Sequence, residues 1–259
     1  LIARAHALQT AGDFEAFVRL AADDMVRHDR RRLVNHPDIV GRDQMLEAQE
    51  AARELGRSQV RSRAIATRGD RLALHEIESE YPSGIVPVLG VSETDGRLMT
   101  RMWHFDPDNY AGALELLDEL YLGQLDDDLA TVFRVVAALA AATNRGDIDF
   151  LADHFADAAV AVDHTSLSWP DLDAIGMVER ARSVASQNLV FAAAELHRLT
   201  AAGIVYSSET WDPTSGFGTA GLSCVIFDAG KVVTWETFAA DDLKAALARF
   251  DELIAEAGC

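Results

Sequence analysis

The sequence predicts an α+β protein built from two repeated units. The first observation is an internal repeat: Gly12-Asp13 recurs as Gly146-Asp147 at a distance of 134 positions, and the same shift relates Asp29 to Asp163. The second is the order of patterns in each unit, where apolar residues recur at helical spacing first and in strand-like runs afterwards. Helices followed by a run of antiparallel strands are typical of the α+β class. The repeat divides the chain into residues 1–124 and 125–259.

Each predicted unit opens with a helix, a break in the chain and a second, shorter helix. The first helix is clearest at residues 129–143, where apolar side chains such as Val132 and Leu139 recur at helical spacing. The Gly-Asp pair ends this helix, because glycine permits the turn and aspartate caps the helix that follows. A strand is expected next, at 25–29 in the first unit and at 159–163 in the second.

The remainder of each unit is predicted to hold one helix, several strands and a closing helix. The ranges are a helix at 43–55 or 175–186, strands at 71–78, 86–92 and 98–105 or 204–211, 221–227 and 232–238, and a helix at 110–122 or 242–257. After Thr100 one residue drops out of the repeat, so that Phe105 matches Phe238. Because solenoid repeats are much shorter, we infer a duplicated domain.

The composition excludes several classes of function. Asp plus Glu number 42 and Lys plus Arg number 23, which leaves a net charge of −19 and makes nucleic acid an unsuitable partner. No apolar run approaches the roughly 20 residues that a membrane span needs, and the first residues do not resemble a signal peptide. The two cysteines, Cys224 and Cys259, form no metal-binding spacing with histidine, and no phosphate-cradling motif occurs. We expect a cytoplasmic protein that has neither a metal nor an organic cofactor.

Short segments of the second unit occur in a characteristic order. They are Arg145-Gly146-Asp147, Phe155-Ala156-Asp157, Val162-Asp163-His164, Leu167-Ser168-Trp169, Gly230-Lys231-Val232-Val233 and Phe238-Ala239-Ala240-Asp241-Asp242-Leu243. Together with the helix–strand order, they resemble SnoaL-like domains of the nuclear transport factor 2-like (NTF2-like, or cystatin-like) superfamily. The first unit departs from the pattern, with Asn35 where the second has Trp169.

The resemblance implies two tandem cones, in each of which a curved antiparallel sheet surrounds helices and leaves an apolar pocket at its open end. Proteins of this superfamily include polyketide cyclases, isomerases and epoxide-opening hydrolases that need no cofactor, and also non-catalytic binding domains. Similar domains occur at the C-terminal end of large regulatory proteins, so the chain is also compatible with being part of one. Because many relatives dimerise through the sheet, the resemblance implies an intrachain pseudo-dimer and a monomeric protein.

Acid–base chemistry in such a pocket requires a titratable group on an inward-facing position of an apolar strand. Asp29 and Asp163 are the first candidates, because both end a strand at equivalent places. The alternative is that each aspartate caps the following loop. His164 follows Asp163 as a candidate proton shuttle, although adjacent strand residues face opposite sides. On the last strand the candidates are His104 in the first unit and Glu236 in the second, with a solvent-facing charge as the alternative.

Aromatic residues are the candidates for lining the pocket, with core packing as the alternative for each. They are Trp103, Trp169, Tyr206, Trp211 and Trp235. The basic run Arg30-Arg31-Arg32 is a candidate for binding a carboxylate or phosphate, against the alternative of salt bridges on a solvated loop.

Two hypotheses of different classes follow. The first is a cofactor-independent acid–base enzyme acting on an apolar small molecule, with Asp163 as base and His164, Glu236 or Tyr206 as acid. The second is a non-catalytic module for ligand binding or interaction. The enzyme predicts an open apolar cavity with at least two converging polar groups, whereas the module predicts an interior without converging acids.

Overall fold

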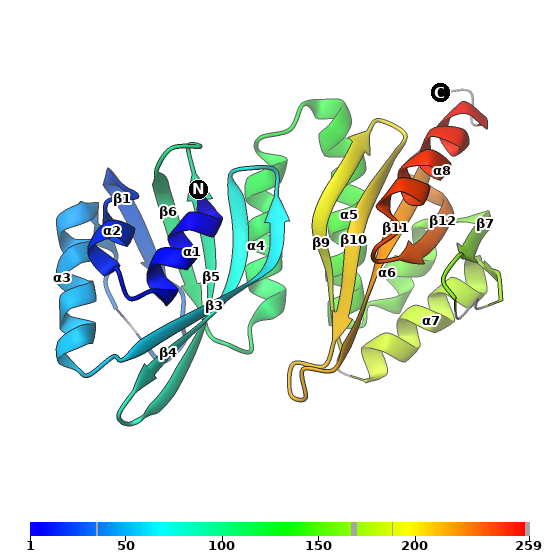
Figure 1. Ribbon diagram of the computed structural model, residues 1–259. Coiled ribbons are helices and arrows are strands. Elements are labelled where there is room, and N and C mark those ends of the chain that lie inside the picture. Colours follow the sequence, from blue (N-terminus) through cyan, green and yellow to red (C-terminus); the bar gives the residue numbers. More distant parts are fainter. Residues whose placement is uncertain (35, 167–169, 188, 257–259) are drawn as a thin grey trace. The chain divides into compact units, whose positions relative to one another are not determined.

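The computed structural model describes residues 1–34, 36–166, 170–187 and 189–256 (Figure 1). Its contacts divide the chain into two compact units, Leu1–Leu117 and Asp118–Cys259. The division falls within the helix α4 (Tyr110–Leu122), earlier in the chain than the join expected at residue 124. Within the described part of the chain, no helix combines the length and apolarity needed to cross a membrane.

The first unit places its helices before most of its strands, as predicted. Its elements are α1 (Ile2–Thr10), α2 (Phe14–Val18), β1 (Ala21–Asp29), β2 (Ile39–Val40), α3 (Gly41–Glu54), β3 (Gln59–Arg68), β4 (Leu72–Tyr81), β5 (Gly84–Thr94), β6 (Met99–Phe105) and α4. The six strands form one sheet in the order β2-β1-β6-β5-β4-β3. The pairing of β1 with β6 is parallel and the other pairings are antiparallel, so the sheet is mixed rather than wholly antiparallel.

The second unit repeats this plan. Its elements are α5 (Asp127–Arg145), α6 (Ile148–Asp153), β7 (Phe155–Asp163), β8 (Leu172–Asp173), α7 (Ala174–Ser186), β9 (Val190–Thr200), β10 (Gly203–Trp211), β11 (Gly218–Asp228), β12 (Lys231–Ala239) and α8 (Leu243–Glu256). The sheet order is β8-β7-β12-β11-β10-β9, with β7 parallel to β12. Element for element this matches the first unit, so the predicted α+β fold of two tandem units is confirmed.

The Gly-Asp pairs act as the sequence predicts. Gly146 follows α5 in the left-handed conformation, with φ of 68°, which glycine adopts without steric cost. Asp147 then caps α6, because its side chain accepts a hydrogen bond from the backbone N–H of Phe150. Asp13 caps α2 through the backbone N–H of Ala16 in the same way.

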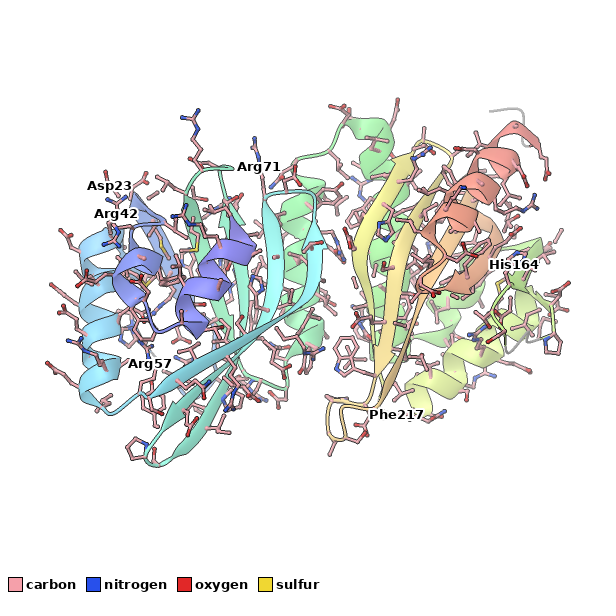
Figure 2. The ribbon with its side chains drawn as sticks, viewed as in Figure 1. Asp23, Arg42, Arg57, Arg71, His164 and Phe217 are labelled. Atoms are coloured by element: carbon pink, nitrogen blue, oxygen red, sulfur yellow. The ribbon has the colours of Figure 1, made fainter. Side chains whose placement is uncertain are left out.

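The start of α3 is tied to the start of β1. Arg42 donates two hydrogen bonds to the backbone carbonyl of Ala21 and forms an ion pair with Asp23 at 3.0 Å (Figure 2). The preceding turn needs glycine at position 41, since φ there is +85° and a Cβ atom would lie 3.1 Å from the carbonyl oxygen of Asp23. Because α3 begins beside the start of β1, its far end lies beside the end of β1.

Each sheet packs one face, here called the inner face, against the opening helices. In the first unit, Phe17 of α2 and Met45 of α3 share a core with Met102 of β6. In the second unit, Phe133 and Val136 of α5 share a core with Tyr206 of β10. The opposite face of the second sheet packs against α8, which the apolar stripe at residues 243–254 predicts.

Candidate functional site

The strand pairings place one row of residues across the inner face of the first sheet. Asp29 is paired with His104, His104 with Gly90, and Gly90 with His75. Residues directly opposite each other on neighbouring strands share a face, so these side chains belong to the same surface. The row thus joins Asp29 and His104, two of the acid–base candidates.

The equivalent row of the second sheet has a different chemistry. It runs from Asp163 to Thr237, then to Ser223 and Tyr206. Two of its hydroxyl groups are linked, because Tyr206 and Ser223 share a side-chain hydrogen bond, and Trp235 Nε1 donates to Ser223 Oγ at 3.3 Å. Burial raises the pKa of Tyr206, which is 2% exposed. The row of the second unit therefore holds one carboxylate, Asp163, and hydroxyl groups where the first row holds His104 and His75.

The rows settle which residues of the last strands share a face. The repeat sets Phe105 against Phe238 and therefore His104 against Thr237, and the strand pairings agree, since Asp29 is paired with His104 and Asp163 with Thr237. Glu236 precedes Thr237, and neighbouring residues of a strand face opposite sides of the sheet. Glu236 therefore lies on the face that packs against α8, where Arg249 contacts it.

Asp29 caps its loop and holds an ion pair. Its side chain is 3% exposed, and Oδ1 accepts hydrogen bonds from the backbone N–H of Arg31 at 3.1 Å and from Arg31 Nε at 2.9 Å. The second carboxylate oxygen pairs with Arg31 Nη2. Burial alone raises the pKa of Asp29, but the hydrogen bonds from Arg31 outweigh it and hold the pKa below its ordinary value.

His104 faces the same charges. Burial, together with the guanidinium groups of Arg27 and Arg31, lowers the pKa of His104 to about 3, against a smaller opposing effect of Asp29. The imidazole is therefore neutral throughout the physiological range.

Two further arginines reach this end of the first unit through α3. Arg27 Nη1 contacts Met45 Sδ at 4.0 Å, and Gln49, one helical turn further on, contacts the same sulfur at 3.7 Å. Arg57 Nη2 donates to Gln49 Oε1 at 2.7 Å. We call Arg27, Arg31 and Arg57 the arginine cluster.

The arginine cluster carries more positive than negative charge. No carboxylate of the described residues lies within ion-pair distance of Arg27 or Arg57, and Asp29 is already bound to Arg31. Arg57 stacks over the ring of Phe14 at 4.2 Å, and its Nε is buried with no hydrogen-bond partner among the described residues. Burial lowers the pKa of both Arg27 and Arg57. For Arg27, Asp29 opposes this effect and the guanidinium groups of Arg31 and Arg57 add to it. For Arg57, a hydrogen bond with the side chain of Tyr81 opposes it.

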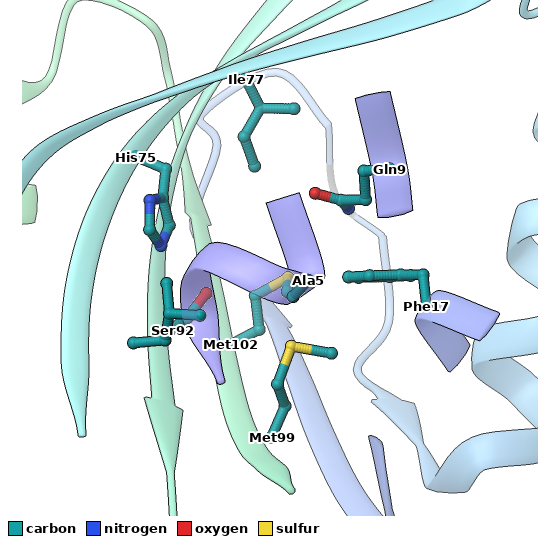
Figure 3. A pocket seen from close by; sticks show the side chains of 9 residues that line it. Ala5, Gln9, Phe17, His75, Ile77, Ser92, Met99 and Met102 are labelled. Atoms are coloured by element: carbon teal, nitrogen blue, oxygen red, sulfur yellow. The ribbon is translucent and has the colours of Figure 1, made fainter. Parts of the chain in front are cut away.

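The space between helices and sheet in the first unit is small. A cavity of about 10 Å³ lies between His75 and Ser92 on one side and Gln9 and Phe17 on the other (Figure 3). This volume holds about one water molecule. At this place the first unit therefore has a water-sized space in place of the larger apolar pocket that the resemblance implies.

In the second unit the structure brings His164 and Glu236 together. His164 Nε2 lies 2.7 Å from Glu236 Oε2, and Arg249 Nε lies 3.1 and 3.2 Å from the two oxygens of the same carboxylate. Glu236 is 3% exposed, and the imidazole stacks on Phe238 at 4.5 Å. Asp163 is not part of this group, because it accepts a hydrogen bond from the backbone N–H of Thr165 at 2.8 Å, as a loop cap does.

The aromatic candidates are mostly packing residues. Trp235 packs against the inner core of the second unit. Trp103 is 4% exposed, stacks on His28 and occupies the position next to His104, which turns it away from the inner row. Trp211 ends β10 and is 7% exposed. Trp169 lies outside the described residues.

Three of the solved structures similar to this chain illustrate the fold. A protein of unknown function with a cystatin-like fold from Methylobium petroleophilum PM1 is 18% identical; the match covers 43% of this chain and 77% of that chain, with a TM-score of 0.39. An NTF2-like protein of unknown function from Burkholderia xenovorans LB400 is 20% identical, with coverages of 40% and 78% and a TM-score of 0.33. A protein with a ketosteroid isomerase-like fold from Catenulispora acidiphila DSM 44928, in complex with trimethylamine, is 15% identical, with coverages of 42% and 86% and a TM-score of 0.32. Neither a family model nor a curated protein matches the sequence.

The two units have the same strand order and the same single parallel strand pair, and each has its own opening helices in the same arrangement. Each unit resembles NTF2-like proteins in fold. Among the residues of the two units, Asp29, His104, His164 and Glu236 were candidates from the sequence, whereas Arg27 and Arg57 were not. Arg27 carries a signal that was available, because it stands two residues before Asp29 and therefore shares its face of β1. Arg57 carries none, since it lies in a loop.

Proposed function

We propose that the first NTF2-like unit is a non-catalytic binding module for a small organic anion, which Arg27 and Arg57 hold. The observation that carries the proposal is the charge of the arginine cluster. Three guanidinium groups converge with one carboxylate in a chain whose net charge is −19. Charges that are removed from water without a partner are costly, and a bound anion offsets that cost.

A carboxylate is the anion that this geometry suits. A guanidinium group presents parallel N–H donors that match the two oxygens of a carboxylate. Arg57 Nε is an N–H donor with no described partner, beside Nη2, which reaches Gln49. The run Arg30-Arg31-Arg32 contributes through Arg31 only, because Arg32 pairs with Asp106 and Asp108 at the surface.

The protonation states favour binding over acid–base catalysis. A general acid or base works best when its pKa lies near the operating pH. The pKa of Asp29 lies below its ordinary value and that of His104 is about 3, so both have moved away from neutrality. Both oxygens of Asp29 are also engaged by Arg31. These features support the non-catalytic alternative for the first unit.

Isothermal titration calorimetry with butyrate, butyramide and butylamine tests the proposal. Butyrate alone is expected to bind, because only it carries the negative charge. Arg27→Gln and Arg57→Gln should each weaken butyrate binding about 10- to 100-fold, as expected for a charge-assisted hydrogen bond. Arg198→Gln is the matched control, since Arg198 is an exposed arginine of the second unit that pairs with Asp251. Equal binding of butyramide, or unchanged affinity in both cluster variants, refutes the proposal.

A further inference from the structure

Exposed apolar side chains occur at the end of the first unit that holds the arginine cluster. We call this group the apolar rim. It consists of Leu33, Val34, Leu55 and Val86. Leu55 is 74% exposed and Val86 is 42% exposed, so neither contributes much to the core. Exposed apolar side chains that gather in one place mark binding sites more often than single ones do.

The strand directions place the apolar rim and the arginine cluster at one end of the sheet. Leu33 and Val34 follow the end of β1, which runs parallel to β6. Because β5 is antiparallel to β6, its first residues, including Val86, extend past the end of β6. Val86 stands four residues before Gly90 and therefore shares the inner face. Leu55 follows the far end of α3, two residues before Arg57.

The apolar rim is held in place by backbone packing. Gly56 lies between Leu55 and Arg57 with φ of +87°, and a Cβ atom there would approach Pro82 Cγ to 2.9 Å. The loop after α3 therefore touches the tip of the β4–β5 hairpin at Pro82, four residues before Val86. Figure 2 shows Arg57 at this end of α3, beside that hairpin. The loop that carries Leu55 and the β4–β5 hairpin thus meet beside Arg57, a member of the arginine cluster.

We infer that the ligand of the first unit is an amphiphilic carboxylate, such as a medium-chain fatty acid, whose head group binds Arg27 and Arg57 and whose chain lies on the apolar rim. This inference rests on the proposed function, since it names the class of the same anion. The water-sized cavity behind His75 leaves no room for an apolar chain at that place. A hydrocarbon chain that extends from the arginine cluster toward the apolar rim would contact apolar side chains that are already exposed to water.

The test is calorimetric titration with acetate, hexanoate and decanoate below their micellar concentrations. A fully buried methylene group contributes about 4-fold in affinity, and a chain lying on a surface contributes less. Decanoate should therefore bind at least about 10-fold more tightly than acetate. The double variant Leu55→Ser/Val86→Ser should lose this chain-length dependence and keep the acetate affinity. Ile175→Ser is the matched control, because Ile175 is an exposed apolar residue of the second unit.

Each alternative outcome is distinct. Equal affinities for acetate and decanoate overturn the inference that the hydrocarbon chain of the ligand is bound, but they remain consistent with the proposed anion site. Failure of every carboxylate to bind overturns both. Decanol binding as tightly as decanoate would show that the head group is not recognised and would also overturn both. Sedimentation with phosphatidylglycerol–phosphatidylcholine vesicles is the last arm, in which no binding is expected; binding that the double variant abolishes would assign the apolar rim to a membrane surface and overturn the free carboxylate.

Discussion

Replacing Asp29 by asparagine is the sharpest test of the electrostatics of the first unit. The substitution keeps the shape of the side chain and removes the carboxylate that is bound to the arginine cluster. It leaves Arg31, whose side chain is 19% exposed, without its ion-pair partner and with Asp106 as a more distant carboxylate. Breaking a buried pair by removing one partner typically costs 3–5 kcal/mol. We expect Asp29→Asn to lower the free energy of opening of the first unit by about 3 kcal/mol.

Hydrogen exchange by mass spectrometry is the suitable assay, because it reports the opening of one unit in a chain that has two. A loss of about 3 kcal/mol corresponds to roughly 100-fold faster exchange of the amides of β1 and β6. The double variant Asp29→Asn/Arg31→Gln should recover much of the loss, since it removes both partners. Asp23→Asn is the control, because Asp23 is 89% exposed in its pair with Arg42. Less than tenfold acceleration in Asp29→Asn, or a double variant no better than the single one, refutes the reasoning.

Three further predictions concern other parts of the chain. Between about pH 6.5 and about pH 3 the unfolded chain protonates His104 and the folded chain does not, so the free energy of unfolding should fall as the pH falls. His104→Gln should make this pH dependence, measured by urea titration, less steep. Glu236→Gln should destabilise the second unit by roughly 1.5–3 kcal/mol, because the buried carboxylate loses its charge-assisted hydrogen bonds from Arg249, whereas His164→Gln should cost less than about 1 kcal/mol since the side chain of His164 is 39% exposed; exchange of the β12 amides separates the two. Gly203→Ala should lower the midpoint of thermal unfolding by several degrees, since its Cβ atom would lie 2.5 Å from the carbonyl oxygen of Val225, whereas Gly123→Ala, at 3.6 Å from its nearest neighbour, should not.

Much of the candidate site was visible in the sequence as single residues but not as a group. Asp29 was identified as a titratable group at a strand end, His164 as the residue after one, and His104 and Glu236 as titratable groups on the last strands. The loop-capping role that was the alternative for Asp29 and Asp163 is the geometry that both adopt. The partnership of His164 with Glu236 was not predictable, because it joins residues 72 positions apart on neighbouring strands.

The amino-acid sequence by itself determined the α+β plan of two similar units, the order of their elements and the helix caps. These are local properties, since a Gly-Asp pair or an apolar stripe acts within a few residues. Only the tertiary structure decided which side chains share a face. The side-chain pattern of a strand has a period of two, so the pairing of His104 with Asp29 places His104 on the inner face, and Glu236, the residue before Thr237, faces the other side. The charge of the arginine cluster was likewise decided only there, because Arg27, Arg31 and Arg57 come from a strand and two loops that meet when the sheet folds.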